Sequence, residues 1–214
     1  SGVPSDWSLN TSDMGSTTTG RVNEWIVGAD YNPGTPQIEV YCPLLGQCIG
    51  PASIPAIDPQ PASVVGSPNS SFLHISYIPT YSSSQGCLVP GFRTTSYWAT
   101  DGICNTQPQN YFARMNAPVN IPAGSAPVKL SFFWVCQAGS STYGEVYYST
   151  DGTTWQGPLT STVTGTTRLH QRGTSWNADT ITLPITRPAS VWIGFRFLNP
   201  QALDGNDPPL AVDD

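Results

Sequence analysis

Glycine and proline occur throughout the chain, with 20 glycines and 21 prolines among 214 residues. Proline has no backbone N–H to donate to a helix or an inner strand, and glycine loses more conformational entropy than other residues when it is ordered. No long stretch shows the 3.6-residue apolar period of an amphipathic helix. The sequence therefore predicts an all-β protein built from short strands and many turns.

The clearest strand is SVWIGFRFLN, residues 190–199, in which apolar and other side chains alternate. Successive side chains of a strand point to opposite faces, so one set is expected to face a core. The predicted inward set is Val191, Ile193, Phe195 and Phe197. The predicted outward set is Trp192, Gly194 and Arg196.

Three further runs have strand character. In GEVYYST, Val146 and Tyr148 share one face and Glu145 and Tyr147 the other. KLSFFWVCQ, residues 129–137, is apolar on both faces, as expected of a central strand covered on both sides. SFLHISYIP, residues 71–79, also alternates. Weaker candidates lie near 163–169 and 179–183, which gives about ten strands.

The first half of the chain contains two long stretches without this alternation. Residues 32–69 are rich in proline and poor in charge, and residues 80–108 carry two cysteines and several aromatic residues. Both are predicted to be ordered loop insertions. No change of composition marks a linker, so we expect one domain, residues 1–214, formed by two stacked antiparallel sheets.

The charge balance limits the classes of partner. The net charge is −6 and Lys129 is the single lysine, so the surface offers little to neutralise a phosphate backbone, and nucleic acid is not an expected partner. The longest apolar run, residues 130–136, is too short to span a bilayer. The chain starts at Ser1 without a basic and apolar leader, so we expect a removed targeting segment or an excised part of a longer protein.

Five cysteines leave at least one thiol unpaired if the others form disulfides. We favour Cys42 with Cys48 and Cys87 with Cys104, because each pair closes a loop that lacks strand periodicity. Cys136 ends an apolar run and is expected to be a buried thiol. A zinc site is the alternative, although no CxxC pair is present. Possible disulfides, scarce lysine and an acidic balance together favour an extracellular protein.

The stretch EVYYSTDGTTWQG resembles the Asp-box of sialidase-type propellers but is one residue short between Asp151 and the following threonine. A propeller repeats such a turn in several blades, and no repeat is present here. We therefore interpret it as a hairpin with a tight Asp-Gly turn, in which Asp151 caps the turn and Trp155 covers the core.

The order of several motifs resembles the cleaved-adhesin and choice-of-anchor J type domains of secreted Bacteroidetes-type proteins and, more distantly, MAM domains. The matching segments are GVPSDWSLN, NEWIVG, SSFLHIS, NYFARMNAPVNIP, VKLSFFWVC, GEVYYSTDGTTW, WNADTITLP and SVWIGFRFLN with LAVDD. The resemblance implies a jelly-roll β-sandwich, one module of a larger surface or secreted protein, often exported by a type IX system, with an adhesive or glycan-binding role. One departure is the start at SGVP, which lacks the acidic residue that often precedes this motif in the family.

The resemblance also implies a structural calcium ion near the final Asp-Asp pair. The segment LDGNDPPLAVDD offers carboxylate and amide oxygens of the kind that calcium prefers. The predicted ligands are Asp204, Asn206, Asp207, Asp213 and Asp214. The alternative is a solvated acidic loop without an ion.

Aromatic and arginine side chains are the candidate contacts for a glycan or a cell-surface protein. A pyranose ring presents an apolar C–H face that can lie on an aromatic ring, and an arginine can bind a carboxylate. The predicted binding residues are Tyr97, Trp98, Tyr143, Trp176, Trp192 and Arg196. Tyr81 and Arg168 are weaker candidates, and each of these residues could instead serve packing or ion pairing.

Catalytic motifs are missing from the sequence, which has no GxSxG, no HExxH and no phosphate-binding glycine loop. We expect a non-catalytic adhesion or carbohydrate-binding module that is secreted or displayed on a cell surface. One alternative is an accessory module of a secreted protease or hydrolase, which neighbouring modules of the same chain would reveal. Another is a glycoside hydrolase or lyase that uses Glu145 as a general acid.

Overall fold

The computed structural model describes residues 6–18, 21, 23–29, 31–68, 70–78, 84–88, 95, 108–200 and 207–214. A short 3₁₀ turn, η1 (Asp13–Gly15), accompanies the strands. The strands are β1 (Trp7–Thr11), β2 (Asn23–Gly28), β3 (Gln37–Cys42), β4 (Gln47–Ser53), β5 (Phe72–Tyr77), β6 (Gln109–Met115), β7 (Val119–Ile121), β8 (Val128–Val135), β9 (Tyr143–Ser149), β10 (Asn177–Leu183), β11 (Ala189–Asn199) and β12 (Ala211–Asp213).

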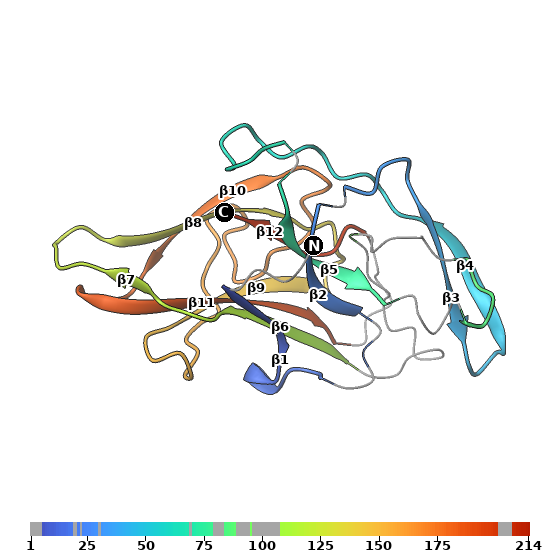
Figure 1. The fold of residues 1–214 in the computed structure, drawn as a ribbon, viewed down its shortest axis with the longest axis horizontal. Coiled ribbons are helices and arrows are strands. Elements are labelled where there is room, and N and C mark those ends of the chain that lie inside the picture. The colour runs from blue at the N-terminus through green and yellow to red at the C-terminus, as the bar shows by residue number, and fades with distance from the viewer. Residues whose placement is uncertain are drawn as a thin grey trace.

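Two antiparallel sheets pack face to face, which confirms the predicted all-β sandwich (Figure 1). The first sheet has the order β1-β6-β11-β7, with β9 paired to the other side of β11. The second sheet has the order β10-β8-β12-β5-β2. A separate two-stranded sheet, β3-β4, lies at one end of the molecule. The jelly-roll connectivity of the main sandwich stays a prediction.

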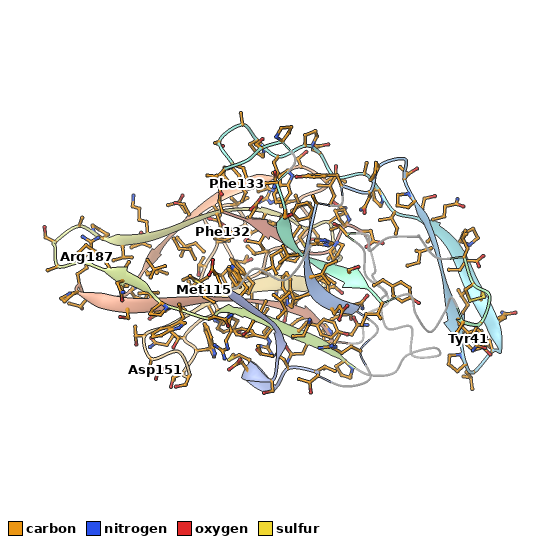
Figure 2. All side chains as sticks on the ribbon, in the orientation of Figure 1. Tyr41, Met115, Phe132, Phe133, Asp151 and Arg187 are labelled. Atoms are coloured by element: carbon orange, nitrogen blue, oxygen red, sulfur yellow. A yellow bond between two sulfur atoms is a disulfide. The ribbon has the colours of Figure 1, made fainter. Side chains whose placement is uncertain are left out.

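The main core fills the space between the two sheets. Phe195 of the first sheet and Phe132 of the second meet there with ring centroids 5.5 Å apart. All four predicted inward residues of β11 are buried in this core, as are Val146 and Tyr148 of β9. Because side chains on the other faces of these strands have different neighbours, the alternation predicted from the sequence is confirmed. Figure 2 shows side chains of both sheets filling the interior.

Asn10 joins the two sheets at one edge of the sandwich. It is the extra residue of a bulge in β1, where the pairing with β6 shifts register, and its φ is 56°. Its side-chain amide donates to the carbonyl of Trp25 at 2.9 Å and accepts from the N–H of Trp25 at 2.8 Å. The Trp25 indole then donates to the carbonyl of Tyr111 at 3.0 Å, so β2 is also tied to β6.

Residues 32–69 are not a simple loop, because they contain the β3–β4 hairpin. The prediction failed here because the proline-rich sequence does not alternate. At the base of the hairpin, Ile38 packs with Ile54 and Tyr77 in a small buried cluster. The predicted strand near 163–169 is also wrong. Only Leu169 forms an isolated bridge, to Gly144, while the predicted strand near 179–183 is confirmed as β10.

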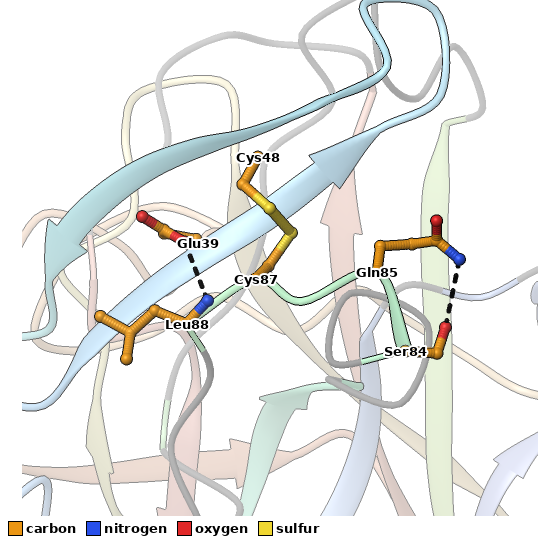
Figure 3. The surroundings of a disulfide bond; sticks show 6 residues. All are labelled: Glu39, Cys48, Ser84, Gln85, Cys87 and Leu88. Atoms are coloured by element: carbon orange, nitrogen blue, oxygen red, sulfur yellow. Dashed lines mark hydrogen bonds between the residues drawn. A yellow bond between two sulfur atoms is a disulfide. The ribbon is translucent and has the colours of Figure 1, made fainter.

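The disulfide pairing differs from the prediction. Cys48 of β4 is bonded to Cys87, and Leu88 beside it donates its N–H to the Glu39 carboxylate at 2.8 Å (Figure 3). Cys42 is also disulfide-bonded. The prediction paired cysteines that are close in sequence, such as Cys42 and Cys48 on either side of one turn. In the structure Cys48 instead bonds to Cys87, which is 39 residues away in sequence.

Cys136 is a free, fully buried thiol, as predicted. Burial raises its pKa to about 12, so the thiol stays protonated and behaves as part of the core. The part of the chain that the structure describes contains no helix with the length and apolar character needed to span a bilayer.

Candidate functional site

A partly open pocket of about 240 Å³ lies between the two sheets. Trp7 and Phe195 of the first sheet form one wall, with their rings stacked at a centroid distance of 5.9 Å. The second sheet forms the opposite wall with Val27, Leu73 and Val212, which occupy one row across β2, β5 and β12. Apolar walls in a concave site are typical of a small-ligand pocket.

Ser71, Phe72, Asp213 and Asp214 complete the lining of this pocket, and Ser71 and Asp214, which are exposed, lie on its open side. Asp214 is exposed, and one of its oxygens accepts the N–H of Val65 at 3.3 Å. A carboxylate at the rim can accept hydrogen bonds from a ligand hydroxyl group. The pocket therefore combines an aromatic wall with polar acceptors at its opening.

Asp213 is held by neutral donors. Its Oδ2 accepts from the Gln60 amide and, at 3.2 Å, from the Ser70 hydroxyl, while its Oδ1 accepts the N–H of Asp214 at 2.9 Å. Burial raises the pKa of Asp213 above 3.8, since desolvation exceeds the effect of these hydrogen bonds. None of the ion pairs among the described residues involves Asp213.

Aromatic side chains support the pocket from the outer face of the second sheet. Phe72, which also lines the pocket, meets Tyr31 at 5.1 Å and Trp176 at 5.3 Å between ring centroids, both edge-on. The Trp176 indole donates to the carbonyl of Asp58 at 2.9 Å. Burial, with the nearby Asp213 charge, raises the pKa of Tyr31 to about 12.

The predicted aromatic binding residues lie in separate places. Trp176 packs on Phe72, as described, and the Trp192 ring lies against Gly152, where an added Cβ would approach it to 3.1 Å. The Tyr143 ring is covered by the Arg168 guanidinium at 4.2 Å. Tyr97 and Trp98 lie outside the described residues, as does Tyr81.

Arg196 belongs to a polar cluster on the outer face of the first sheet. Its guanidinium pairs with the Glu145 carboxylate at 3.5 Å and donates to Asn110 Oδ1 at 2.8 Å. The Tyr147 hydroxyl donates to the same Glu145 oxygen at 2.7 Å, and burial raises the pKa of Tyr147 to about 12. Glu145 is 7% exposed, so its carboxylate already has protein partners and little access to solvent.

The Asp-box-like stretch forms a wide loop on the same outer face. Tyr148 and Gln156 exchange backbone hydrogen bonds of 3.1 and 2.8 Å, which leaves residues 149–155 as the loop. Asp151 Oδ1 accepts the N–H groups of Thr153 and Thr154 at 2.7 and 2.6 Å. These bonds hold the pKa of Asp151 well below its usual range, and the predicted capping role is confirmed.

Two details of the hairpin prediction are wrong. Only Gly152, not Asp151, has a positive φ, so the connection is not a two-residue primed turn. Trp155 covers the outer face of the first sheet and not the main core. Its ring meets Phe112 edge-on at 4.9 Å and lies over Gly194, where any Cβ would collide with Phe112.

The predicted calcium ligands do not all gather in one place. The strand β12 pairs with β8 from Ala211 to Asp213, and before it the Pro208 carbonyl accepts the N–H of Gln137. Asp207 precedes the Pro208–Gln137 hydrogen bond, whereas Asp213 pairs with Phe133 at the far end of β12. An ion at Asp213 would therefore not reach Asp207.

Asp213 and Asp214 supply two neighbouring carboxylates, and Asp204 and Asn206 lie outside the described residues. Among the residues that are described, no group of three His, Cys, Asp or Glu side chains is placed to hold a metal ion.

No family model matches this chain, and searches of curated proteins and of solved structures also found no match. The function must therefore be argued from the site itself.

The sequence does not predict this pocket, because its walls come from five strands. The sequence around Trp7 and Val27 predicts short strands without indicating a pocket, and the pattern around Phe195 predicts a core residue. The sequence does predict a functional role for Asp213 and Asp214, but as metal ligands. The alternation of β11 could have indicated that Phe195 faces inward, but nothing in the sequence indicates that Trp7 lies over it.

Proposed function

We propose that this chain is a non-catalytic recognition module of the adhesin-like jelly-roll type, part of a secreted or surface-displayed bacterial protein, and that it binds a carbohydrate. The observation that carries the proposal is the pocket walled by Trp7 and Phe195, with the exposed Asp214 carboxylate in its lining. A pyranose can place its C–H face on an aromatic wall while one of its hydroxyls donates to the exposed Asp214 carboxylate.

Other features support this assignment. The Cys48–Cys87 disulfide is typical of proteins in oxidising compartments, in line with a secreted or surface location. Glu145, the candidate general acid, is enclosed by Arg196 and Tyr147, which favours a structural role over a catalytic one. An extracellular protein that presents surface sugars is the corresponding partner.

The test is a glycan array followed by titration calorimetry on any sugar that binds. Trp7→Ala is expected to weaken binding by about tenfold or more, as for an aromatic anchor. Asp214→Ala, at an exposed rim position, should weaken it less. Trp192→Ala is the matched control, because that ring lies under the Gly152 loop on the other side of the first sheet. Absence of binding to any glycan would reject the proposal.

A structural calcium ion is a separate proposal, supported by the adjacent Asp213 and Asp214 carboxylates. An ion that binds only the native state raises the melting temperature by mass action. The melting temperature is therefore expected to fall when a chelator replaces calcium, and Asp214→Asn should reduce that difference. Identical melting curves with calcium and with chelator would reject the ion.

A further inference from the structure

The tip of the β3–β4 hairpin exposes two neighbouring leucines. Leu44 is 73% exposed and Leu45 is 49% exposed. The hairpin lies beyond the end of the sandwich, and Tyr41, near this tip, is at the far end of the molecule in Figure 2. Large apolar side chains that stand together in solvent mark contact surfaces more often than single ones do.

The turn that carries these leucines is held in one conformation. The N–H groups of Leu45 and Gly46 both donate to the carbonyl of Cys42, at 3.2 and 2.9 Å. The cysteines on either side of the turn, Cys42 and Cys48, are both disulfide-bonded. A contact made by this tip therefore needs little further ordering, which favours binding.

The pocket at Trp7 has the properties of an acceptor for this tip. Its walls are aliphatic and aromatic, and its volume of about 240 Å³ exceeds the roughly 150 Å³ of an apolar cavity that holds a benzene-sized group. One leucine side chain fits such a space. The exposure of Leu44 shows that the tip does not enter the pocket of its own chain.

We propose that the Leu44–Leu45 tip of one copy of this chain inserts into the Trp7 pocket of a second copy. Residues 40–57 carry no charge, so the tip meets the Asp213 and Asp214 rim without like-charge repulsion. Donor and acceptor are different surfaces, so the contact is head-to-tail and leaves each pair with a free tip and a free pocket. The association therefore extends beyond a dimer.

The net charge and the contact area determine how strongly two copies are expected to associate. Each copy carries −6, so the copies repel one another at low ionic strength, and salt screens this repulsion. A contact confined to one tip and one pocket falls below the area of stable interfaces, so the association is weak. A sugar in the pocket would compete with the tip, although the inference does not require that a sugar binds.

The experiment is sedimentation equilibrium from micromolar to millimolar protein, at low and at high salt. The wild-type chain is expected to form dimers and larger species at high concentration, and more of them in salt. The double variant L44D/L45D should lower the association constant by about tenfold or more. Val119→Asp is the control for added negative charge, since Val119 is 48% exposed on β7, and at high salt it should change the association constant far less than L44D/L45D does.

A mixing experiment tests the polarity of the contact. Val27→Phe fills the pocket but keeps the tip, and L44D/L45D keeps the pocket, so the two variants together should form heterodimers and nothing larger. If Val27→Phe does not fold, the sedimentation experiment on L44D/L45D alone tests whether the leucine tip makes the contact. A monomer at every concentration, a dimer that never grows, or equal effects of L44D/L45D and Val119→Asp would each overturn the inference. Because glycan binding is measured separately, the proposed function can fail while this inference stands, and the reverse also holds.

Discussion

The two sheets of the sandwich cover their outer faces with different chemistry. The first sheet is covered by segments that directly follow its own strands, residues 12–16 after β1 and 150–155 after β9. Its charges are paired as Glu145 with Arg196 and Asp13 with Arg114. The second sheet is covered by residues 54–68, far from most of its strands in sequence, and by aromatic rings around Phe72. Its half-buried carboxylate, Asp213, has neutral donors.

This difference separates two ways in which a sandwich is stabilised. On the first sheet, a polar network is favourable only while both charges remain, since a lone buried charge is costly. On the second sheet, aromatic burial supplies the stability, and the carboxylate is tolerated with a raised pKa. The first sheet should therefore respond most to loss of a charge and the second to loss of apolar volume.

The largest effect is expected at Phe72, which is 1% exposed and contacts Tyr31 and Trp176. Phe72→Ala should lower the free energy of unfolding by about 4 kcal/mol, because it removes a buried ring and leaves a cavity. The counterpart on the first sheet is Trp155→Ala, where the ring is partly exposed, so the loss should be less than half as large. Urea unfolding measures the free energy of unfolding of both variants. Equal losses for Phe72→Ala and Trp155→Ala would contradict the proposed difference between the outer faces of the two sheets.

The next effect is expected at Arg196. Arg196→Ala leaves the Glu145 carboxylate buried without its cation and should destabilise the protein by about 3 kcal/mol. Arg114→Ala is the matched control, since the Arg114–Asp13 pair is more exposed and should contribute about 1 kcal/mol or less. Combining Glu145→Gln with Arg196→Met should recover much of the stability. Similar losses for the two arginine variants would show that burial of the pair has no special cost.

A smaller, pH-dependent effect is expected at Asp151. Its folded-state pKa lies below the ordinary 3.8, so the stability that it contributes is present above pH 3.8 and is lost as the pH falls further. Asp151→Asn should therefore lower the melting temperature at pH 6, and the difference should shrink below pH 3.8. A difference that persists undiminished in strong acid would show that the carboxylate charge is not what holds the loop.

The smallest effect, of opposite sign, is expected at Asp213. Its folded-state pKa lies above 3.8, so its contribution is fully present below pH 3.8 and is lost as the pH rises through the folded-state value. Asp213→Asn should be at least as stable as the parent at pH 7 and relatively less stable in acid. Melting curves with chelator present exclude any effect of a bound ion, and Asp214→Asn is the control. If the melting-temperature differences of Asp151→Asn and Asp213→Asn changed with pH in the same direction, the proposed difference between the two sheets would be contradicted.

Much of the sandwich was predictable because its central strands follow a simple rule. Each inward residue of β11 could be identified from alternation alone, since both β11 and its partner β9 bury one face in the same core. β8 could be identified as central because both of its faces are apolar, and Trp134 and Val135 do lie in different clusters.

The parts that could not be predicted depend on long-range contacts. Among the described residues of the β3–β4 hairpin, Ile38 and Cys42 are the buried apolar side chains, so burial imposes little alternation on its sequence. Cys48 pairs with Cys87 because folding brings the 84–88 segment beside β3, which spacing does not reveal. The pocket exists only once β1 and β2 lie over one another, so Trp7 and Val27 gave no separate signal.

The two hydrogen bonds between the Asn10 side chain and the Trp25 backbone have a consequence for the behaviour of this protein at high concentration. β1 and β2 are edge strands of different sheets, and unpaired edge groups are templates for pairing with another chain. The Asn10 amide satisfies both backbone groups of Trp25, so at this point an incoming strand finds neither a donor nor an acceptor. One side chain thus protects an open edge from aggregation, the protection that a barrel obtains by closing its sheet.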